Sequence, residues 1–207
     1  MSLWGRKKIG EMTPAEIRRL VAEKYATVAQ APQARYKFRV GSEYACDLGY
    51  PTTLLSALPP ALSEAFTGVS ASLATLSEVK PGETVLELGC GGGLDTALLA
   101  DRVGPEGRVI GVDCAGPMLA RAQASLRQLG YSNVSLFQAP AECLPLADNS
   151  VDCVVSNGIF NLSAEKDAIF AEIKRVLKPG GRAVNAEIVL RAEPTQAERD
   201  SQEDWFT

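Results

Sequence analysis

The sequence predicts an α/β protein built on a doubly wound, mostly parallel sheet, and three observations carry this prediction. Short apolar segments rich in β-branched residues alternate with amphipathic helical segments over residues 80–190, as in parallel sheets with right-handed crossovers. The first apolar segment, residues 84–88, runs into a loop with four glycines in the five positions 89–93. The next apolar segment ends on Asp113, at the sheet edge where α/β proteins hold nucleotide-like ligands.

Residues 1–79 precede this pattern and are expected to form a helical lid. Thr13 and Pro14 are an N-cap followed by proline at the first helical position, which predicts a helix over residues 13–30. Residues 31–52 are expected to be irregular. A second helical segment is predicted from Pro59, with its apolar residues on one face, and Gly68 is a candidate break in it.

Residues 80–190 are expected to form the cofactor-binding α/β domain. After the glycine loop, strands are predicted over residues 108–113, 133–137, 150–156 and 182–190. Helices are predicted after the glycine loop, from residue 117 to 130, and from residue 163 to 177. The final residues, 191–207, form a polar tail without a strand pattern. A sheet that ends after five strands has an exposed edge, so either another element covers it or the chain is shorter than the natural gene product.

Composition limits the classes of function. The 207 residues are 46% hydrophobic and 22% charged, as in ordinary globular domains. No apolar run approaches the ~18 residues of a membrane span, and no signal-peptide pattern opens the chain, so we expect a cytoplasmic protein with no membrane partner. The net charge is −4, with nine Lys/Arg against three Asp/Glu in residues 1–40. This distribution favours a basic, solvated N-terminal helix and argues against nucleic-acid binding.

Cysteine and histidine usage narrows the chemistry further. The five cysteines show no CxxC spacing and histidine is absent, so no metal site is predicted. An odd number of cysteines without a secretory signal indicates free thiols in a reducing compartment. The lack of histidine also removes the commonest general base and every Ser-His or Cys-His nucleophile.

The glycine loop differs from a dinucleotide fingerprint. In G-x-G-x-x-G the third glycine lets the helix pack closely on the strand. Gly89 and Gly91 fit the first two positions, but Leu94 stands at the third, and Glu87 precedes the first glycine by two residues. An NAD-dependent oxidoreductase is therefore a weaker alternative. A carboxylate at Asp113 can accept hydrogen bonds from both ribose hydroxyls.

Three motifs together resemble the class I S-adenosylmethionine-dependent methyltransferases: residues 80–93, residues 111–113, and residues 175–181. Residues 130–134, 144–152 and 156–163 are most similar to the arsenite methyltransferase-like branch, which includes UbiE-like methyltransferases. The resemblance implies a Rossmann-like sheet in the order 3-2-1-4-5, with later strands absent or truncated. It also implies S-adenosylmethionine as cofactor, S-adenosylhomocysteine as product and a small-molecule methyl acceptor.

The resemblance also implies roles for individual residues. The glycines make room for the methionine and ribose, Glu87 orders the loop, and Asp113 holds the ribose. Cys114 and Met118 border the adenine, Ala141 and Glu142 meet its edge, and Asn157 lies beneath the methionine. The implied cofactor-binding residues are Glu87, Gly89, Cys90, Gly91, Gly93, Asp113, Cys114, Met118, Ala141, Glu142 and Asn157. No catalytic residue is predicted, because methyl displacement depends mostly on alignment in a dry pocket.

Several positions depart from the branch. Pro140 replaces an acid that faces the adenine, and proline offers neither a carboxylate nor an N–H group. Gly158 stands where the branch has a cysteine, and Cys46 is the single cysteine where it has an N-terminal pair. An arsenite methyltransferase is thus disfavoured. The competing hypothesis is a cofactor-binding domain without turnover, truncated or dependent on a partner such as a second copy in a homodimer.

Overall fold

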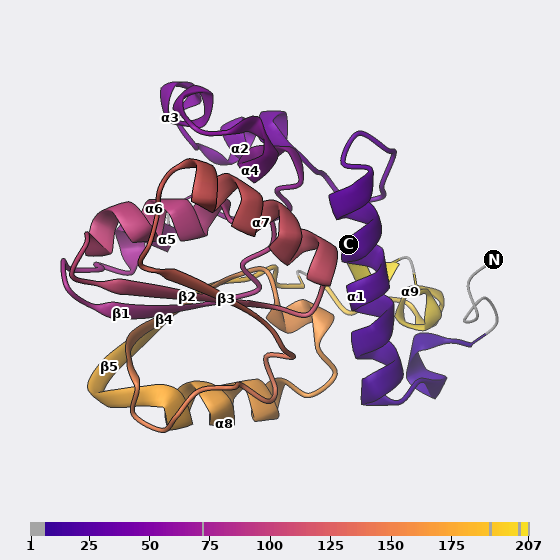
Figure 1. The fold of residues 1–207 in the computed structure, drawn as a ribbon. Helices are drawn as coiled ribbons and strands as arrows, with labels where there is room; N and C mark the ends of the chain where they lie inside the picture. Colours follow the sequence, from indigo (N-terminus) through magenta and orange to yellow (C-terminus); the bar gives the residue numbers. More distant parts are fainter. Residues whose placement is uncertain (1–6, 72, 191, 203, 207) are drawn as a thin grey trace.

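The computed structural model describes residues 7–71, 73–190, 192–202 and 204–206. Five parallel strands form one sheet in the order β3-β2-β1-β4-β5, so the predicted class and strand order are confirmed (Figure 1). The central strands β1 and β4 are almost wholly buried, because helices cover both of their faces. The strands are β1 (Thr84–Leu88), β2 (Arg108–Asp113), β3 (Val134–Gln138), β4 (Val151–Asn157) and β5 (Leu177–Ala186).

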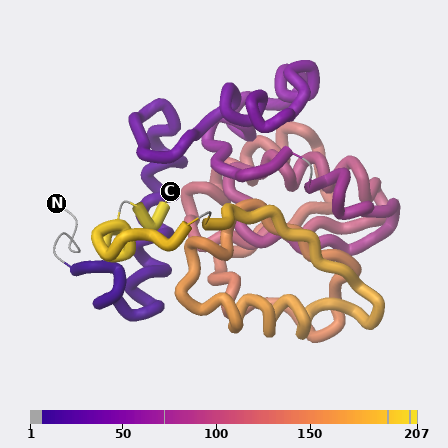
Figure 2. Tube along the Cα trace, turned by 180° about the vertical axis from the view of Figure 1, so that it is seen from behind, coloured from indigo at the N-terminus to yellow at the C-terminus, as the bar shows by residue number. Residues whose placement is uncertain are grey.

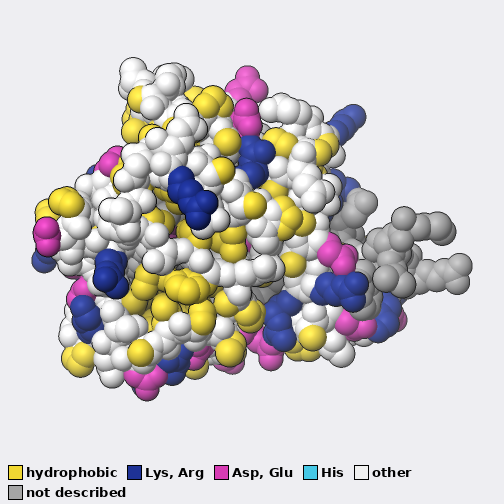
Figure 3. Space-filling view, viewed as in Figure 1, with side chains coloured by type: hydrophobic (Ala, Val, Ile, Leu, Met, Phe, Trp, Pro, Cys, Tyr) yellow, Lys and Arg dark blue, Asp and Glu magenta, His cyan; other side chains and the backbone are white. Residues whose placement is uncertain are grey.

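Helices cover the two faces of the sheet unequally. In Figure 1, α5, α6 and α7 lie on one face and α8 on the other. Residues 139–150, between β3 and β4, contain no helix, and hydrophobic side chains gather on the surface near α8 (Figure 3). Phe137 and Phe170 are among the exposed large hydrophobic residues. The bounds are α5 (Leu73–Leu76), α6 (Leu94–Val103), α7 (Gly116–Gln128) and α8 (Lys166–Val176).

The last strand differs from its prediction. Expected over residues 182–190, β5 instead begins at Leu177 and ends at Ala186. Its register shifts after the pair Val151–Leu177 and resumes at the pair Cys153–Arg182. Residues 178–181, Lys-Pro-Gly-Gly, precede the predicted strand but lie within β5 as an irregularity, and Gly180 has a φ of +81° there. The apolar residues Ile188, Val189 and Leu190 follow the strand and are exposed.

The N-terminal region contains more helices than predicted. The first predicted helix is present as α1 (Pro14–Gln30), with the Thr13 hydroxyl accepting from Glu16 N. Residues 31–52 are not wholly irregular, because residues 42–48 form a helix. The long helix predicted from Pro59 is interrupted between residues 64 and 73, a stretch that includes Gly68. The remaining N-terminal elements are η1 (Ile9–Glu11), α2 (Ser42–Leu48), α3 (Thr52–Ala57) and α4 (Pro60–Glu64).

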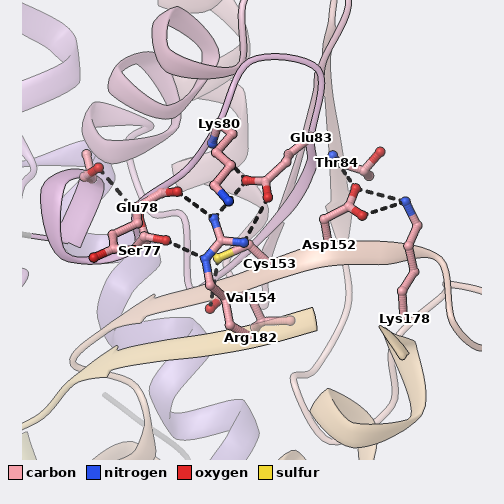
Figure 4. Close-up of polar contacts among 11 residues, drawn as sticks. Ser77, Glu78, Lys80, Glu83, Thr84, Asp152, Cys153, Val154, Lys178 and Arg182 are labelled. Carbon is pink, nitrogen blue, oxygen red and sulfur yellow. Dashed lines mark hydrogen bonds and ion pairs between the residues drawn. The ribbon is translucent and has the colours of Figure 1, made fainter. Parts of the chain in front are cut away.

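Polar contacts close the amino edge of the sheet (Figure 4). The Arg182 guanidinium donates to the Glu83 carboxylate at 2.7 and 2.8 Å and to the backbone oxygens of residues 77 and 78. Beside it, the Asp152 carboxylate accepts from Lys178 Nζ at 2.8 Å and from Thr84 N at 2.8 Å. These contacts tie the beginnings of β1, β4 and β5 to one another and to residues 77–83.

The two ends of the chain lie side by side beyond the carboxyl edge (Figure 2). The C-terminal elements α9 (Gln196–Asp200) and η3 (Asp204–Phe206) follow β5. Phe206 is buried in a cluster with Ile9, Met12, Ile17 and Val21. None of the described helices is both long enough and apolar enough to span a membrane.

Candidate functional site: a cofactor cavity at the carboxyl edge of the sheet

A cavity with about 770 Å³ of empty space, part of it open to solvent, lies at the carboxyl ends of β1, β2 and β4. Seven of the eleven predicted site residues line it. These seven are Gly89, Gly91, Asp113, Cys114, Ala141, Glu142 and Asn157. One cavity therefore brings together three parts of the chain that were predicted separately. These parts are the glycine loop, the end of β2 and residues 141–142.

The glycine loop approaches the cavity with its backbone. Gly89 and Gly91 have φ values of +72° and +49°, which favour glycine. A Cβ atom on Gly89 would lie 2.2 Å from Ile159 Cγ2, whereas a Cβ on Gly91 would meet nothing within 4 Å. Gly91 thus leaves open space on the cavity side, as a loop that a ligand approaches closely requires.

Asp113 is fixed at the cavity wall by its neighbours. Its Oδ2 accepts from Gly91 N at 2.9 Å and its Oδ1 accepts from Ala115 N at 2.8 Å. Burial raises the pKa of Asp113, and the hydrogen bonds from these two N–H groups offset part of the increase. A carboxylate offers about four lone-pair sites, so both oxygens can still accept from a ligand such as a ribose.

Two more acids lie buried beneath the loop. The Glu87 Oε2 accepts from Thr96 Oγ1 at 2.5 Å, and Asp95 is 6% exposed. Burial raises the pKa of both carboxyl groups, and the Asp95 charge raises that of Glu87 further. Glu87 therefore joins β1 to the first turn of α6.

Asn157 lines the cavity, but its amide is engaged by protein groups. Its Oδ1 accepts from Val69 N at 2.7 Å and Ser70 N at 3.1 Å. Its Nδ2 donates to Asp95 Oδ2 at 2.9 Å, and Tyr50 Oη donates to Asp95 Oδ1 at 2.5 Å. Asn157 thus holds residues 69 and 70 against the edge of the sheet. Its position beneath the methionine of the cofactor stays a prediction.

Four of the predicted site residues lie outside the cavity wall, namely Glu87, Cys90, Gly93 and Met118. Cys90 is buried against Gly111, where a Cβ would come within 2.9 Å of its Sγ. Gly93 caps α6 and lies so close to Ala122 that a Cβ would come within 2.9 Å of the alanine Cβ. Met118 is 1% exposed and packs in a cluster with Val28 of α1. Their positions support packing roles.

The opposite end of the cavity is polar. Glu142 lines it, and its Oε1 accepts from Ser163 Oγ at 2.5 Å. Pro140 also lines this end, and its carbonyl accepts from Cys143 N at 3.1 Å. The turn at residues 140–143 therefore presents Ala141 and Glu142 to the cavity.

Helix α1 also forms part of the wall, and it belongs to residues 1–79, which we expected to form a lid. Arg18, Val21 and Tyr25 all line the cavity, and Arg18 pairs with Glu165. Burial and the Asp113 charge raise the pKa of Tyr25. The sequence did not indicate which residues of this helix face the cavity.

The described residues contain no group of three His, Cys, Asp or Glu side chains arranged to hold a metal ion. All five cysteines are free thiols. Cys114 is the cysteine that lines the cavity, and burial and Asp113 raise its pKa to about 12.

The five parallel strands in the order 3-2-1-4-5, the glycine loop and the acid at the end of β2 fit the cofactor-binding domain of a class I S-adenosylmethionine-dependent methyltransferase. The chain belongs to the methyltransferase-domain family, whose model matches residues 79–206. The predicted family and the predicted cofactor, S-adenosylmethionine, are thereby confirmed.

Relatives support the same branch. The chain is 44% identical over 112 residues to an arsenite methyltransferase of Halobacterium salinarum, covering 54% of this chain and 29% of the relative. It is 45% identical over 108 residues to the ubiquinone/menaquinone biosynthesis C-methyltransferase UbiE of Pasteurella multocida, covering 51% and 40%. The match thus spans less than half the length of each of these two relatives. A crystal structure of a SAM-dependent methyltransferase from Aquifex aeolicus matches 76% of this chain and 79% of its own, with a TM-score of 0.54 and 25% identity.

Proposed function

We propose that the chain transfers a methyl group from S-adenosylmethionine to a small-molecule acceptor. The observation that carries this proposal is the convergence of Gly91, Asp113 and Glu142 on one cavity. Each offers a group suited to one part of the cofactor: backbone space, a carboxylate fixed for hydroxyl groups, and a polar edge for the adenine.

The residues of the chain bind and orient, and the sulfonium of the cofactor supplies the reactive methyl group. Asp113 accepts hydrogen bonds from the ribose, with its oxygens held by Gly91 N and Ala115 N. Asn157, which lines the cavity, holds residues 69 and 70 against the edge of the sheet. Methyl transfer then needs alignment more than a strong base, which suits a chain without histidine.

An arsenic acceptor receives no support from the thiols. Capture of As(III) by several thiolates requires cysteines close together, whereas Cys114 alone among the described cysteines lines the cavity. We therefore favour an oxygen, nitrogen or carbon nucleophile. We further propose that residues 1–79 act as the lid, since α1 lines the cavity, and that the protein works in the cytoplasm, since its cysteines are free thiols.

Calorimetry with S-adenosylmethionine and S-adenosylhomocysteine tests the proposal. Both should bind at sub-millimolar concentration. Asp113→Ala should weaken binding roughly 100-fold, because it removes two hydrogen bonds to a charged group, while the exposed Asp167→Ala serves as the control. The absence of binding, or equal affinities for Asp113→Ala and the wild type, would overturn the proposal. Binding without transfer to any acceptor would favour a domain without turnover.

A further inference from the structure

A second cavity, with about 630 Å³ of empty space, adjoins the cofactor cavity. Tyr25, Thr67 and Gly158 line both cavities. The other walls of the second cavity come from residues 37–44 and from the C-terminal part of the chain, including Ile188 and Phe206. The second cavity is thus formed by the two ends of the chain, which lie side by side in Figure 2.

The walls are rich in aromatic rings. Tyr25, Phe38, Tyr44 and Phe206 all line the second cavity. The Phe38 ring lies 6.0 Å from that of Tyr25 and 6.4 Å from that of Phe206, measured between centroids. Such rings offer flat apolar faces on which another ring can stack.

The charge in these walls is positive. Lys37 and Arg39 line the cavity, and no Asp or Glu is among its described lining residues. Lys37 pairs with Asp204 at 3.2 Å and Arg39 pairs with Asp47, so both cations are held in place by acids outside the wall. The side chains of Lys37 and Arg39 are 52% and 59% exposed, which places them where the cavity opens to solvent.

The junction between the cavities is narrow and depends on Gly158. Its φ is +81°, and a Cβ there would lie 3.0 Å from Val69 Cγ1. A side chain on residue 158 would extend toward Val69 and narrow the space where the two cavities adjoin. Gly158 therefore lies where the two cavities adjoin, and glycine leaves more room there than any other residue would.

We propose that the second cavity binds the methyl acceptor, and that this acceptor is a planar aromatic carboxylate. That the ligand is the methyl acceptor rests on the proposed function, whereas the binding site is argued from its own residues. The ring of the ligand packs against the aromatic side chains of the wall, and its carboxylate faces Lys37 and Arg39.

Naphthalene probes test the chemistry of this cavity by fluorescence titration of the full chain in low-salt buffer. 6-Hydroxy-2-naphthoate should bind about tenfold more tightly than the uncharged 6-hydroxy-2-naphthamide, since a charge-assisted contact is worth about 1.5–3 kcal/mol. Equal affinities for the acid and the amide would overturn the proposal, and this comparison requires no variant.

Paired variants locate the effect. The double variant Lys37→Met/Arg39→Gln should abolish the preference for the acid over the amide. The control Lys174→Met/Arg127→Gln removes the same charges from exposed positions on α8 and α7 and should preserve it. Thermal denaturation checks that both variants fold. A preference that survives in the first variant, or disappears in the control, would contradict the assignment to this cavity.

The two proposals can fail separately. Naphthoate binding is measured without cofactor and again with saturating S-adenosylhomocysteine. Suppose that S-adenosylhomocysteine does not bind, while the wild type still prefers the acid to the amide and the Lys37→Met/Arg39→Gln variant does not. The proposed function then fails, and the proposed anion site stands. If S-adenosylhomocysteine binds and the acid preference is absent, the acceptor proposal alone fails.

Discussion

The two neighbouring cavities are built in opposite ways. The cofactor cavity is formed largely at the ends of parallel strands, where backbone geometry at Gly89 and Gly91 and a fixed carboxylate at Asp113 make its wall. The second cavity is formed by residues far apart in sequence. Five of its described lining residues lie within residues 25–44, and the others are Thr67, Val69, Gly158, Asn161, Ile188 and Phe206. A rigid scaffold thus carries the cofactor while loops and chain ends determine what else can bind, a division that lets one fold serve many acceptors.

Gly91→Ala should have the largest effect on the cofactor cavity. The new methyl group enters space that we assign to the cofactor, and overpacking costs about 1–3 kcal/mol, up to a roughly 100-fold loss of S-adenosylhomocysteine affinity. Calorimetry measures this loss. The second cavity should be unaffected, with unchanged binding of 6-hydroxy-2-naphthoate.

Gly82→Ala is a matched control for backbone strain. Gly82 also has a positive φ, +85°, and a Cβ there would meet nothing within 4 Å, but it lies in the turn before β1. Both variants should lose about 1 kcal/mol of stability, yet only Gly91→Ala should lose affinity. Equal losses of affinity in the two variants would contradict the assigned position of the cofactor.

The cofactor cavity was far more predictable than the second cavity. Gly89, Gly91 and Asp113 follow predicted strands, and the carboxyl ends of parallel strands meet at one edge. Residues 188–206 carry no comparable signal, because the burial of Phe206 depends on a surface that η1 and α1 create. The helices at residues 42–48 and 52–57 were missed for a similar reason, since short helices depend on packing more than on their own periodicity.

Tyr50→Phe should disrupt the wall between the cavities. The Tyr50 hydroxyl donates to Asp95, and Asp95 accepts from Asn157, which holds residues 69 and 70. Loss of the hydroxyl leaves a buried carboxyl oxygen short of a donor, at a cost of about 2 kcal/mol. Urea unfolding measures the change.

Tyr131→Phe provides the comparison for that variant. The Tyr131 hydroxyl donates to Asp101 Oδ1 at 2.6 Å in an exposed pair, so its loss should cost less than about 1 kcal/mol. Equal losses of unfolding free energy in Tyr50→Phe and Tyr131→Phe would mean that the buried Tyr50 hydrogen bond stabilises the protein no more than the exposed Tyr131 hydrogen bond does.

Glu87→Gln should have the smallest effect, and it concerns the support of the cofactor cavity alone. Burial raises the pKa of Glu87 in the folded chain, so the protonated form is favoured by folding. The stability that protonated Glu87 contributes is therefore fully present below the pKa that Glu87 has in the unfolded chain. This stability is lost as the pH rises through the higher pKa that Glu87 has in the folded chain. Glutamine does not titrate, so the stability of the variant relative to wild type should increase between about pH 5 and pH 8.

The exposed Glu106→Gln should leave the pH dependence of unfolding unchanged. Thermal unfolding across this pH range measures both variants. A Glu87→Gln profile parallel to that of wild type would show that Glu87 does not titrate with a raised pKa.

A crystal structure of the chain with S-adenosylhomocysteine tests the central claim most directly, namely that one cavity holds the cofactor and opens onto the other. We predict the ribose hydroxyls within hydrogen-bond distance of Asp113, the adenine beside Ala141 and Glu142, and the sulfur facing Gly158 and the second cavity. A cofactor bound elsewhere, or a sulfur turned away from Gly158, would contradict the account.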